Sequence, residues 1–60
     1  MRTYSFFIRT HELGTDKVIH VSAHTVEAAT IKEARKKADD MTPPTGYNDV
    51  YWTHTEVIRD

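Results

Sequence analysis

The chain has 60 residues, of which 28% are charged and 38% hydrophobic, with no cysteine and a formal net charge of −1. Such a short chain forms at most one domain and buries only about 60% of the surface that its unfolded form exposes. The missing cysteines exclude disulfides and thiolate metal sites, and the balanced charge argues against general binding to phosphate backbones. We therefore expect one small domain over residues 1–60, with homodimer formation as an open alternative.

The first two predicted elements are strands over Tyr4–Arg9 and Lys17–Ala23, joined by a turn at Glu12–Asp16 that contains Gly14. Aromatic and β-branched residues dominate the first strand, and side chains alternate between the two faces of a strand. In the first strand this alternation separates Tyr4, Phe6 and Ile8 from Ser5, Phe7 and Arg9. In the second it separates Ile19, Val21 and Ala23 from Val18, His20 and Ser22.

A helix is predicted over Val26–Asp40, with Thr25 as its N-cap and Glu27 in its first turn. Apolar residues recur at steps of three and four and form one stripe, which indicates a face packed against a sheet. The stripe consists of Ala28, Ile31, Ala34, Ala38 and Met41. Thr42-Pro43-Pro44 ends the helix, because proline cannot continue it.

A loop over Thr42–Asp49 leads to a last strand over Val50–Ile58. Either alternate face of this strand could point inward: the one with Trp52 and His54, or the one with Tyr51 and Thr53. The simplest topology pairs the last strand with the first. The predicted fold is therefore α+β, a three-stranded antiparallel sheet (ββαβ, strand order 2-1-3) with one helix on one face.

A three-stranded sheet with one helix leaves its second face open to solvent. On that face we expect Phe7, Arg9, Val18 and His20, joined by Trp52 and His54 or, alternatively, by Tyr51 and Thr53. The face is rich in apolar and aromatic residues for a surface left in water. The candidate partner-binding residues are therefore Phe7, Arg9, Val18, His20, Trp52 and His54.

The sequence predicts no catalytic residue, metal site or cofactor. His20 and His24 are four apart, but on an extended strand that spacing is roughly 13 Å, too far for two ligands of one metal. His11 and His54 are interpreted as surface and sheet-face residues. Ser5 and Ser22 lie within strands, without the sharp turn that exposes a nucleophile, and the carboxylates are scattered.

The one local basic cluster comprises Lys32, Arg35, Lys36 and Lys37. Nucleic-acid modules of the stacking type surround an aromatic sheet face with basic residues. Here the cluster lies on the predicted helix, away from Phe7 and Arg9, which favours a solvated helix face. A small nucleic-acid-binding module that uses the sheet aromatics and basic residues is kept as the alternative function.

Two stretches of the chain are similar to those of small accessory proteins encoded by bacteriophages. One is the aromatic first strand, Tyr4–Ile8, and the other is the strand-to-helix run Val21–Ala29. This resemblance implies a non-catalytic protein that binds a host or phage macromolecule, for example as an inhibitor. It assigns no functional residue.

No run of about 18 apolar residues occurs, so no membrane-spanning segment is predicted. The short apolar run Phe6–Ile8 is ended by Arg9 and does not resemble a signal peptide. We expect a cytoplasmic protein with a protein partner of unknown identity. The partner would bind through the open sheet face.

Overall fold

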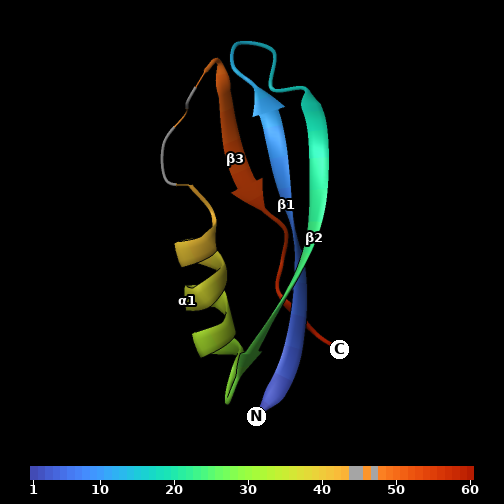
Figure 1. The fold of residues 1–60 in the computed structure, drawn as a ribbon, viewed down its shortest axis with the longest axis vertical. Helices are drawn as coiled ribbons and strands as arrows, with labels where there is room; N and C mark the ends of the chain where they lie inside the picture. The colour runs from blue at the N-terminus through green and yellow to red at the C-terminus, as the bar shows by residue number, and fades with distance from the viewer. Residues whose placement is uncertain (44–45, 47) are drawn as a thin grey trace.

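The structure is a computed structural model that describes residues 1–43, 46 and 48–60. It contains β1 (Arg2–Glu12), β2 (Val18–Ala28), α1 (Ile31–Met41), β3 (Val50–His54) and β4 (Ile58–Arg59) (Figure 1). The sheet is antiparallel with the order β2-β1-β3, and β4 also pairs with β1. The predicted α+β class and the predicted strand order are confirmed, with a short fourth strand in addition.

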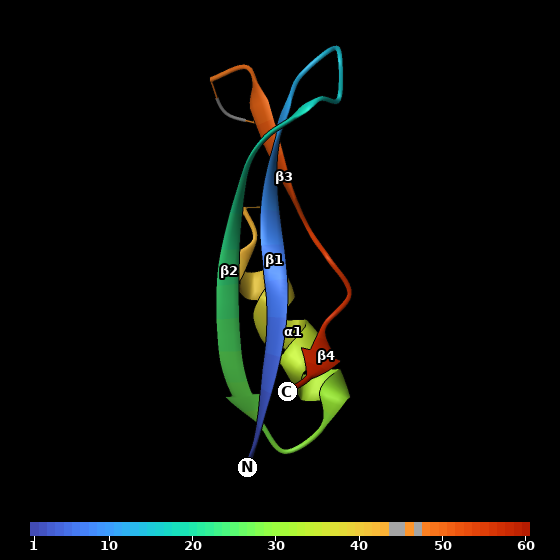
Figure 2. The same cartoon turned by 90° about the vertical axis from the view of Figure 1, so that its right-hand side faces the viewer.

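β1 and β2 form a long hairpin that is twisted along its length (Figure 2). In the turn, Glu12 N–H donates to the Lys17 carbonyl at 2.8 Å, and Asp16 N–H donates to the Glu12 carbonyl at 2.9 Å. Gly14 adopts φ +94°, a conformation that costs glycine little. Both strands extend further than predicted, because β1 pairs with β2 all the way to Arg2 opposite Ala28.

The helix begins at Ile31, five residues later than the predicted start at Val26, which is therefore wrong. Val26 lies opposite Tyr4 in the sheet, so strand pairing holds this segment extended. The N-cap is Thr30, whose hydroxyl accepts from Glu33 N–H at 3.3 Å. The Glu33 carboxylate accepts in turn from Ala29 N–H at 3.3 Å, an arrangement close to a capping box.

The predicted last strand is interrupted between β3 and β4. At the interruption Thr55 N–H donates to the Phe7 carbonyl at 2.8 Å, and the Thr55 hydroxyl accepts from Phe7 N–H at 2.9 Å. A side chain thus replaces a backbone carbonyl in the ladder, and the chain turns Val57 into the core, where it is 1% exposed. Within the predicted loop Thr42–Asp49, positions 44, 45 and 47 lie outside the described residues.

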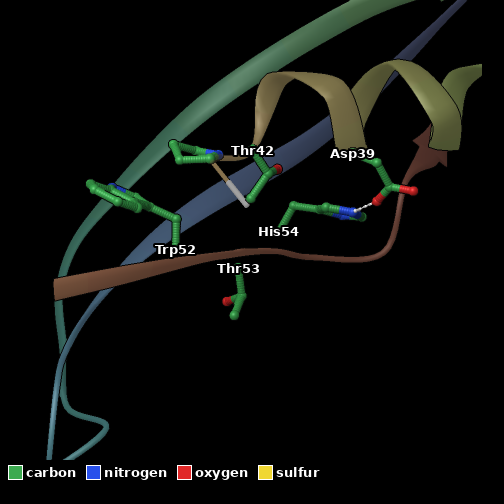
Figure 3. A pocket seen from close by; sticks show the side chains of 6 residues that line it. Asp39, Thr42, Trp52, Thr53 and His54 are labelled. Atoms are coloured by element: carbon green, nitrogen blue, oxygen red, sulfur yellow. Dashed lines mark hydrogen bonds and ion pairs between the residues drawn. The ribbon is translucent and has the colours of Figure 1, made fainter. Parts of the chain in front are cut away.

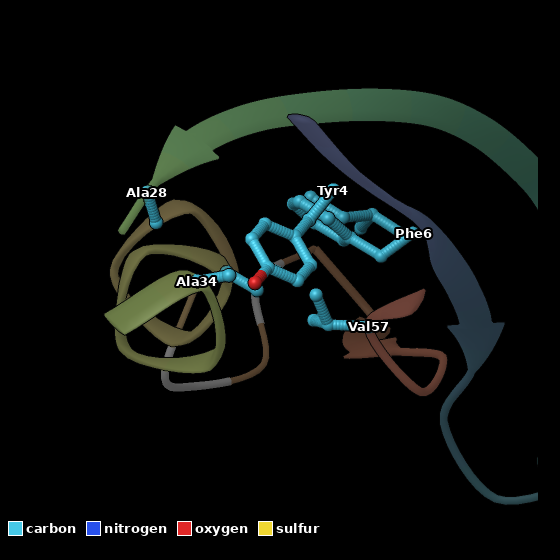
Figure 4. Close-up of a cluster of buried hydrophobic side chains, with 7 residues drawn as sticks. Tyr4, Phe6, Ala28, Ala34 and Val57 are labelled. Carbon is cyan, nitrogen blue, oxygen red and sulfur yellow. The ribbon is translucent and has the colours of Figure 1, made fainter. Parts of the chain in front are cut away.

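The buried core lies between α1 and the sheet, as Figure 4 shows for several of its members. Ala34 and Ala38 of the predicted helix stripe are fully buried, whereas Ile31 and Met41 remain exposed. The core residues are Tyr4, Phe6, Ile8, Ala28, Ala34, Ala38 and Val57. Eleven helical residues rise only about 16 Å, whereas the molecule is 38 Å long. The helix therefore covers one end of the sheet and leaves the hairpin end uncovered (Figure 1).

Candidate functional site

The sheet face away from α1 carries a group of exposed apolar side chains. Phe7 and Val21 are each 48% exposed and Ile58 is 56% exposed. Phe7 lies opposite Ala23, Arg9 lies opposite Val21, and Ser5 lies opposite Ile58, so these side chains share one face. We call Phe7, Val21, Ala23 and Ile58 the open-face patch. Its polar neighbours on the same face include Arg9, Thr53 and Thr25.

Three of the six predicted partner-binding residues lie on this open face. Phe7 and Arg9 alternate with the buried side chains of β1, as predicted. Val18 also reaches this side, because it pairs with His11 beyond a register shift at Thr10/His11. Ile19 is the extra residue of this bulge, which breaks the alternation along β2.

The other three predicted residues lie on the helix side, so their predicted placement on the open face is wrong. His20 lies opposite Thr10, on the side to which Ile8 points. The bulge separates it from Val18, which simple alternation had put on the same face. Trp52 lies opposite Thr10 and His54 opposite Ile8, so β3 turns its other residues, Tyr51 and Thr53, to the open face.

His54 joins the helix to β3 on the helix side. Its Nε2 lies 2.6 Å from Asp39 Oδ1, and its Nδ1 lies 2.8 Å from the Thr55 carbonyl (Figure 3). Both partners are acceptors, so the arrangement is satisfied when both ring nitrogens carry protons. The Thr55 carbonyl and then Asp39 raise the pKa of His54, while partial burial opposes them. In that form the ring has no lone pair left for a base or a metal ligand.

A cavity of about 420 Å³ lies beside this ion pair and opens to solvent. Figure 3 shows Trp52 and Thr53 projecting to opposite sides of β3 at this place. The lining residues are Asp39, Thr42, Pro43, Trp52, Thr53 and His54. His54 Nε2 and Asp39 Oδ1 lie 2.6 Å apart and bind each other. This contact fixes the end of the helix to β3, so the two groups do not point into the cavity toward a ligand.

A second polar group stabilises the hairpin end on the open face. The rings of His11 and Tyr51 are stacked with centroids 4.7 Å apart and planes 8° apart. His11 Nε2 lies 2.7 Å from Thr53 Oγ1, and Tyr51 donates its hydroxyl hydrogen to Asp16 Oδ1 at 2.7 Å. This hydrogen bond to Asp16 is the main cause that raises the pKa of Tyr51.

Ser22 and His24 form the one close serine–histidine pair among the described residues, with Oγ 2.8 Å from Nε2. The His24 ring also stacks on Phe6, with centroids 5.6 Å apart. Both residues lie within a regular strand, and no carboxylate of the described part hydrogen-bonds to His24. A nucleophile needs an oriented base, so this pair is better explained as packing and hydrogen bonding on the sheet.

Within the described ranges 1–43, 46 and 48–60, no three His, Asp or Glu side chains are grouped so that they could hold a metal ion. The helix α1, which carries the basic residues, lies behind the sheet in Figure 2, whereas the open-face patch belongs to the opposite face of the sheet. The two surfaces therefore point in different directions. A single flat ligand cannot cover both.

Sequence reasoning missed Val21, Ala23 and Ile58 as members of the open face. The alternation of β1 was sufficient to place Phe7, and the pairing of Phe7 with Ala23 would have placed the other β2 residues. The missing information was the register between the strands. That register depends on a bulge that no glycine or proline marks in Val18–His20.

Comparisons of the chain with models of protein families, with curated proteins and with solved structures each found no match. No helix in the described part of the chain is both long and apolar enough to cross a membrane. The surfaces of the molecule are thus the basis for any functional conclusion.

Proposed function

We propose that this chain is a small, non-catalytic protein-binding module that contacts a larger protein through its open-face patch. In the manner of the phage accessory proteins that it resembles, it would act by blocking or adapting that partner. The observation that supports this most directly is the exposure of Phe7, at 48%, in a chain whose buried core comprises seven of the described residues.

The energetics favour an apolar partner surface. Burying a side chain such as Phe7, Val21 or Ile58 contributes roughly 1.5–3 kcal/mol relative to leaving it in water. The three share one face, where Phe7 lies between Val21 on one neighbouring strand and Ile58 on the other, with Arg9 and threonines on the same face. An apolar centre with a polar rim is the usual composition of a protein–protein interface.

The proposal is tested by capture from cell lysate with three forms of the protein. Phe7→Ser should lose the captured protein while circular dichroism shows an unchanged fold, because the Phe7 side chain lies outside the core. The matched control replaces Lys32, Arg35 and Lys36 by glutamine, and it should keep the captured protein. A folded Phe7→Ser variant that retains every partner of the parent would contradict the proposal.

The alternative, binding of a nucleic acid, gives the opposite pattern in the same experiment. Binding to phosphates releases counterions, so affinity falls steeply with salt, whereas an apolar interface is much less sensitive. Loss of binding in the triple glutamine variant, together with a steep salt dependence, would replace the proposed function by this one.

A further inference from the structure

The hydrogen bonds of β1 reveal which way the backbone groups of β2 point. Phe7 directs both its N–H and its carbonyl toward Thr55, and the Thr3 carbonyl accepts from Asp60 N–H at 3.0 Å. The odd-numbered residues of β1 therefore direct their backbone groups toward β3 and β4. In an antiparallel ladder, two directly opposite residues either hydrogen-bond to each other through their backbone groups or both direct these groups away from each other.

Val21, Ala23 and Thr25 lie opposite odd-numbered residues of β1. Their N–H and carbonyl groups consequently point out from the edge of the sheet, and no described residue hydrogen-bonds to them. The Glu27 carbonyl points the same way, and there Lys37 Nζ from α1 donates to it. We call Val21–Thr25 the free edge. It is bounded by the bulge at Ile19 on one side and by the helix on the other.

The free edge lacks the features that normally prevent strand addition. Edge strands are protected by lysine, by proline, by short length or by a covering element. β2 is 11 residues long, its only formally charged residue is Glu27, and it contains no proline. The bulge lies near its start and leaves Val21–Thr25 regular.

We propose that the free edge pairs with the same edge of a second copy of this chain, and so forms a two-fold symmetric dimer with one continuous sheet. The two-fold axis of this dimer passes at Ala23. In this register Val21 lies opposite Thr25 of the second copy, so the outward-pointing backbone groups of Val21, Ala23 and Thr25 are all hydrogen-bonded. Two alanine methyl groups meet at the axis, where their small size allows close approach.

The side chains of the free edge are compatible with a second copy as the occupant. Val21–Thr25 contains no Asp, Glu, Lys or Arg, so two copies can lie antiparallel about Ala23 without repulsion between formally charged side chains. The dimer also brings the two open-face patches together on one side of the joined sheet, since Val21 and Ala23 belong to both surfaces.

The first test is the solution mass measured by sedimentation over a range of concentrations, which should rise to twice that of the monomer. Ala23→Pro should lower it to the monomer, because it removes the outward N–H at the axis without removing a hydrogen bond to β1. Ala23→Val, which keeps this N–H, should remain dimeric. A parent that is monomeric at every concentration, or a folded Ala23→Pro variant that stays dimeric, overturns the proposal.

The second test does not depend on a disruptive substitution. The chain has no cysteine, so Ala23→Cys provides a single thiol. Opposite residues of a hydrogen-bonded pair have Cα atoms about 5.5 Å apart, within the range of a disulfide. Under mild oxidation this variant should cross-link many times faster than Lys32→Cys, whose thiol lies on the exposed side of α1. Equal rates for the two variants would overturn the proposal.

The dimer uses outward-pointing backbone groups of the free edge, whereas the proposed function uses side chains of the open-face patch, so the two proposals fail differently. Dissociation by Phe7→Ser with no effect of Ala23→Pro would show that copies meet through the open-face patch, and would overturn pairing at the free edge. Loss of partner capture by Phe7→Ser with an unchanged dimer mass would support both.

Discussion

The two ends of the sheet are stabilised in different ways. At the helix end, Tyr4 and Phe6 pack against Ala34 and Val57, and each of these side chains is at most 3% exposed. At the hairpin end no residue from Arg9 to Val21 is buried, and the contacts are the stacked His11 and Tyr51 with their hydrogen bonds. The same two strands thus pass from an apolar core into a region held by polar contacts.

This difference shows how a short chain distributes its few apolar residues. A 60-residue domain has only about 3–9 kcal/mol of net stability at typical values per residue. Most of it must come from the helix end, where apolar surface is buried. The hairpin end and the open face are then free to carry exposed side chains, at a small cost to the fold.

The largest effect is expected for Ala34→Asp. Ala34 is fully buried between α1 and the sheet, so the new carboxylate would have neither water nor a partner. A cost above about 4 kcal/mol would leave the chain largely unfolded, as measured by circular dichroism. Lys36→Asp, on the exposed side of the same helix, should retain the parent fold. Equal melting temperatures for the two variants would contradict the position of the core.

The next largest effect compares two adjacent residues of one strand. Phe6→Ala should cost about 3–5 kcal/mol in urea unfolding, because Phe6 is buried in the core. Phe7→Ala should cost less than about 1 kcal/mol, because half of that side chain already lies in water. A similar loss at both positions would mean that the open face is covered within the monomer.

A smaller effect concerns the His54–Asp39 pair. Because the folded-state pKa of His54 is raised, its stabilisation is fully present below about pH 6.5 and is lost as the pH rises through the folded-state pKa. A single partly exposed ion pair contributes less than about 1 kcal/mol. His54→Gln should remove this part of the pH dependence of unfolding, and Asp39→Asn should lower the His54 pKa in an NMR titration. A His54 pKa unchanged by Asp39→Asn would contradict the pairing.

The smallest effect is expected at the hairpin end. Tyr51→Phe removes the hydrogen bond to Asp16 but keeps the stacking on His11. It should lower the melting temperature only slightly, and the tyrosine absorbance titration should lose the component with the raised pKa. A melting temperature as low as that of Phe6→Ala would show that the polar contacts stabilise the whole fold, and would remove the distinction between the two ends.

The parts of the fold that could be predicted are those that depend on periodicity alone. Alternation correctly placed Phe6 in the core and Phe7 outside it, and the helical spacing identified Ala34 and Ala38. The helix start could not be decided in this way, because Thr25 and Thr30 are both good caps. The capping signal Thr30–Glu33 was readable, but only the pairing of Val26 with Tyr4 determines that the strand continues.

Of the candidate site, Phe7, Arg9 and Val18 were correctly predicted on the open face. The faces of β3 and β2 follow from register, and register is set by contacts between distant parts of the chain. The bulge at Ile19 and the substitution of the Thr55 hydroxyl for a backbone acceptor both arise from such contacts. That is why His20 was predicted on the wrong face, and why the sequence could not decide between Trp52 with His54, which were named as candidates, and Tyr51 with Thr53, which the structure places on the open face.

The central position of β1 has a consequence for the order of folding. β1 pairs with β2 across a short turn, but it pairs with β3 and β4 only after the helix has been placed. Closing long loops costs entropy before any contact compensates for it, so the hairpin should form early and β4 should dock last. Until then one edge of β1 is unpaired and Val57 is missing from the core. The transition state for folding should therefore depend strongly on substitutions in the hairpin and weakly on those near Ile58.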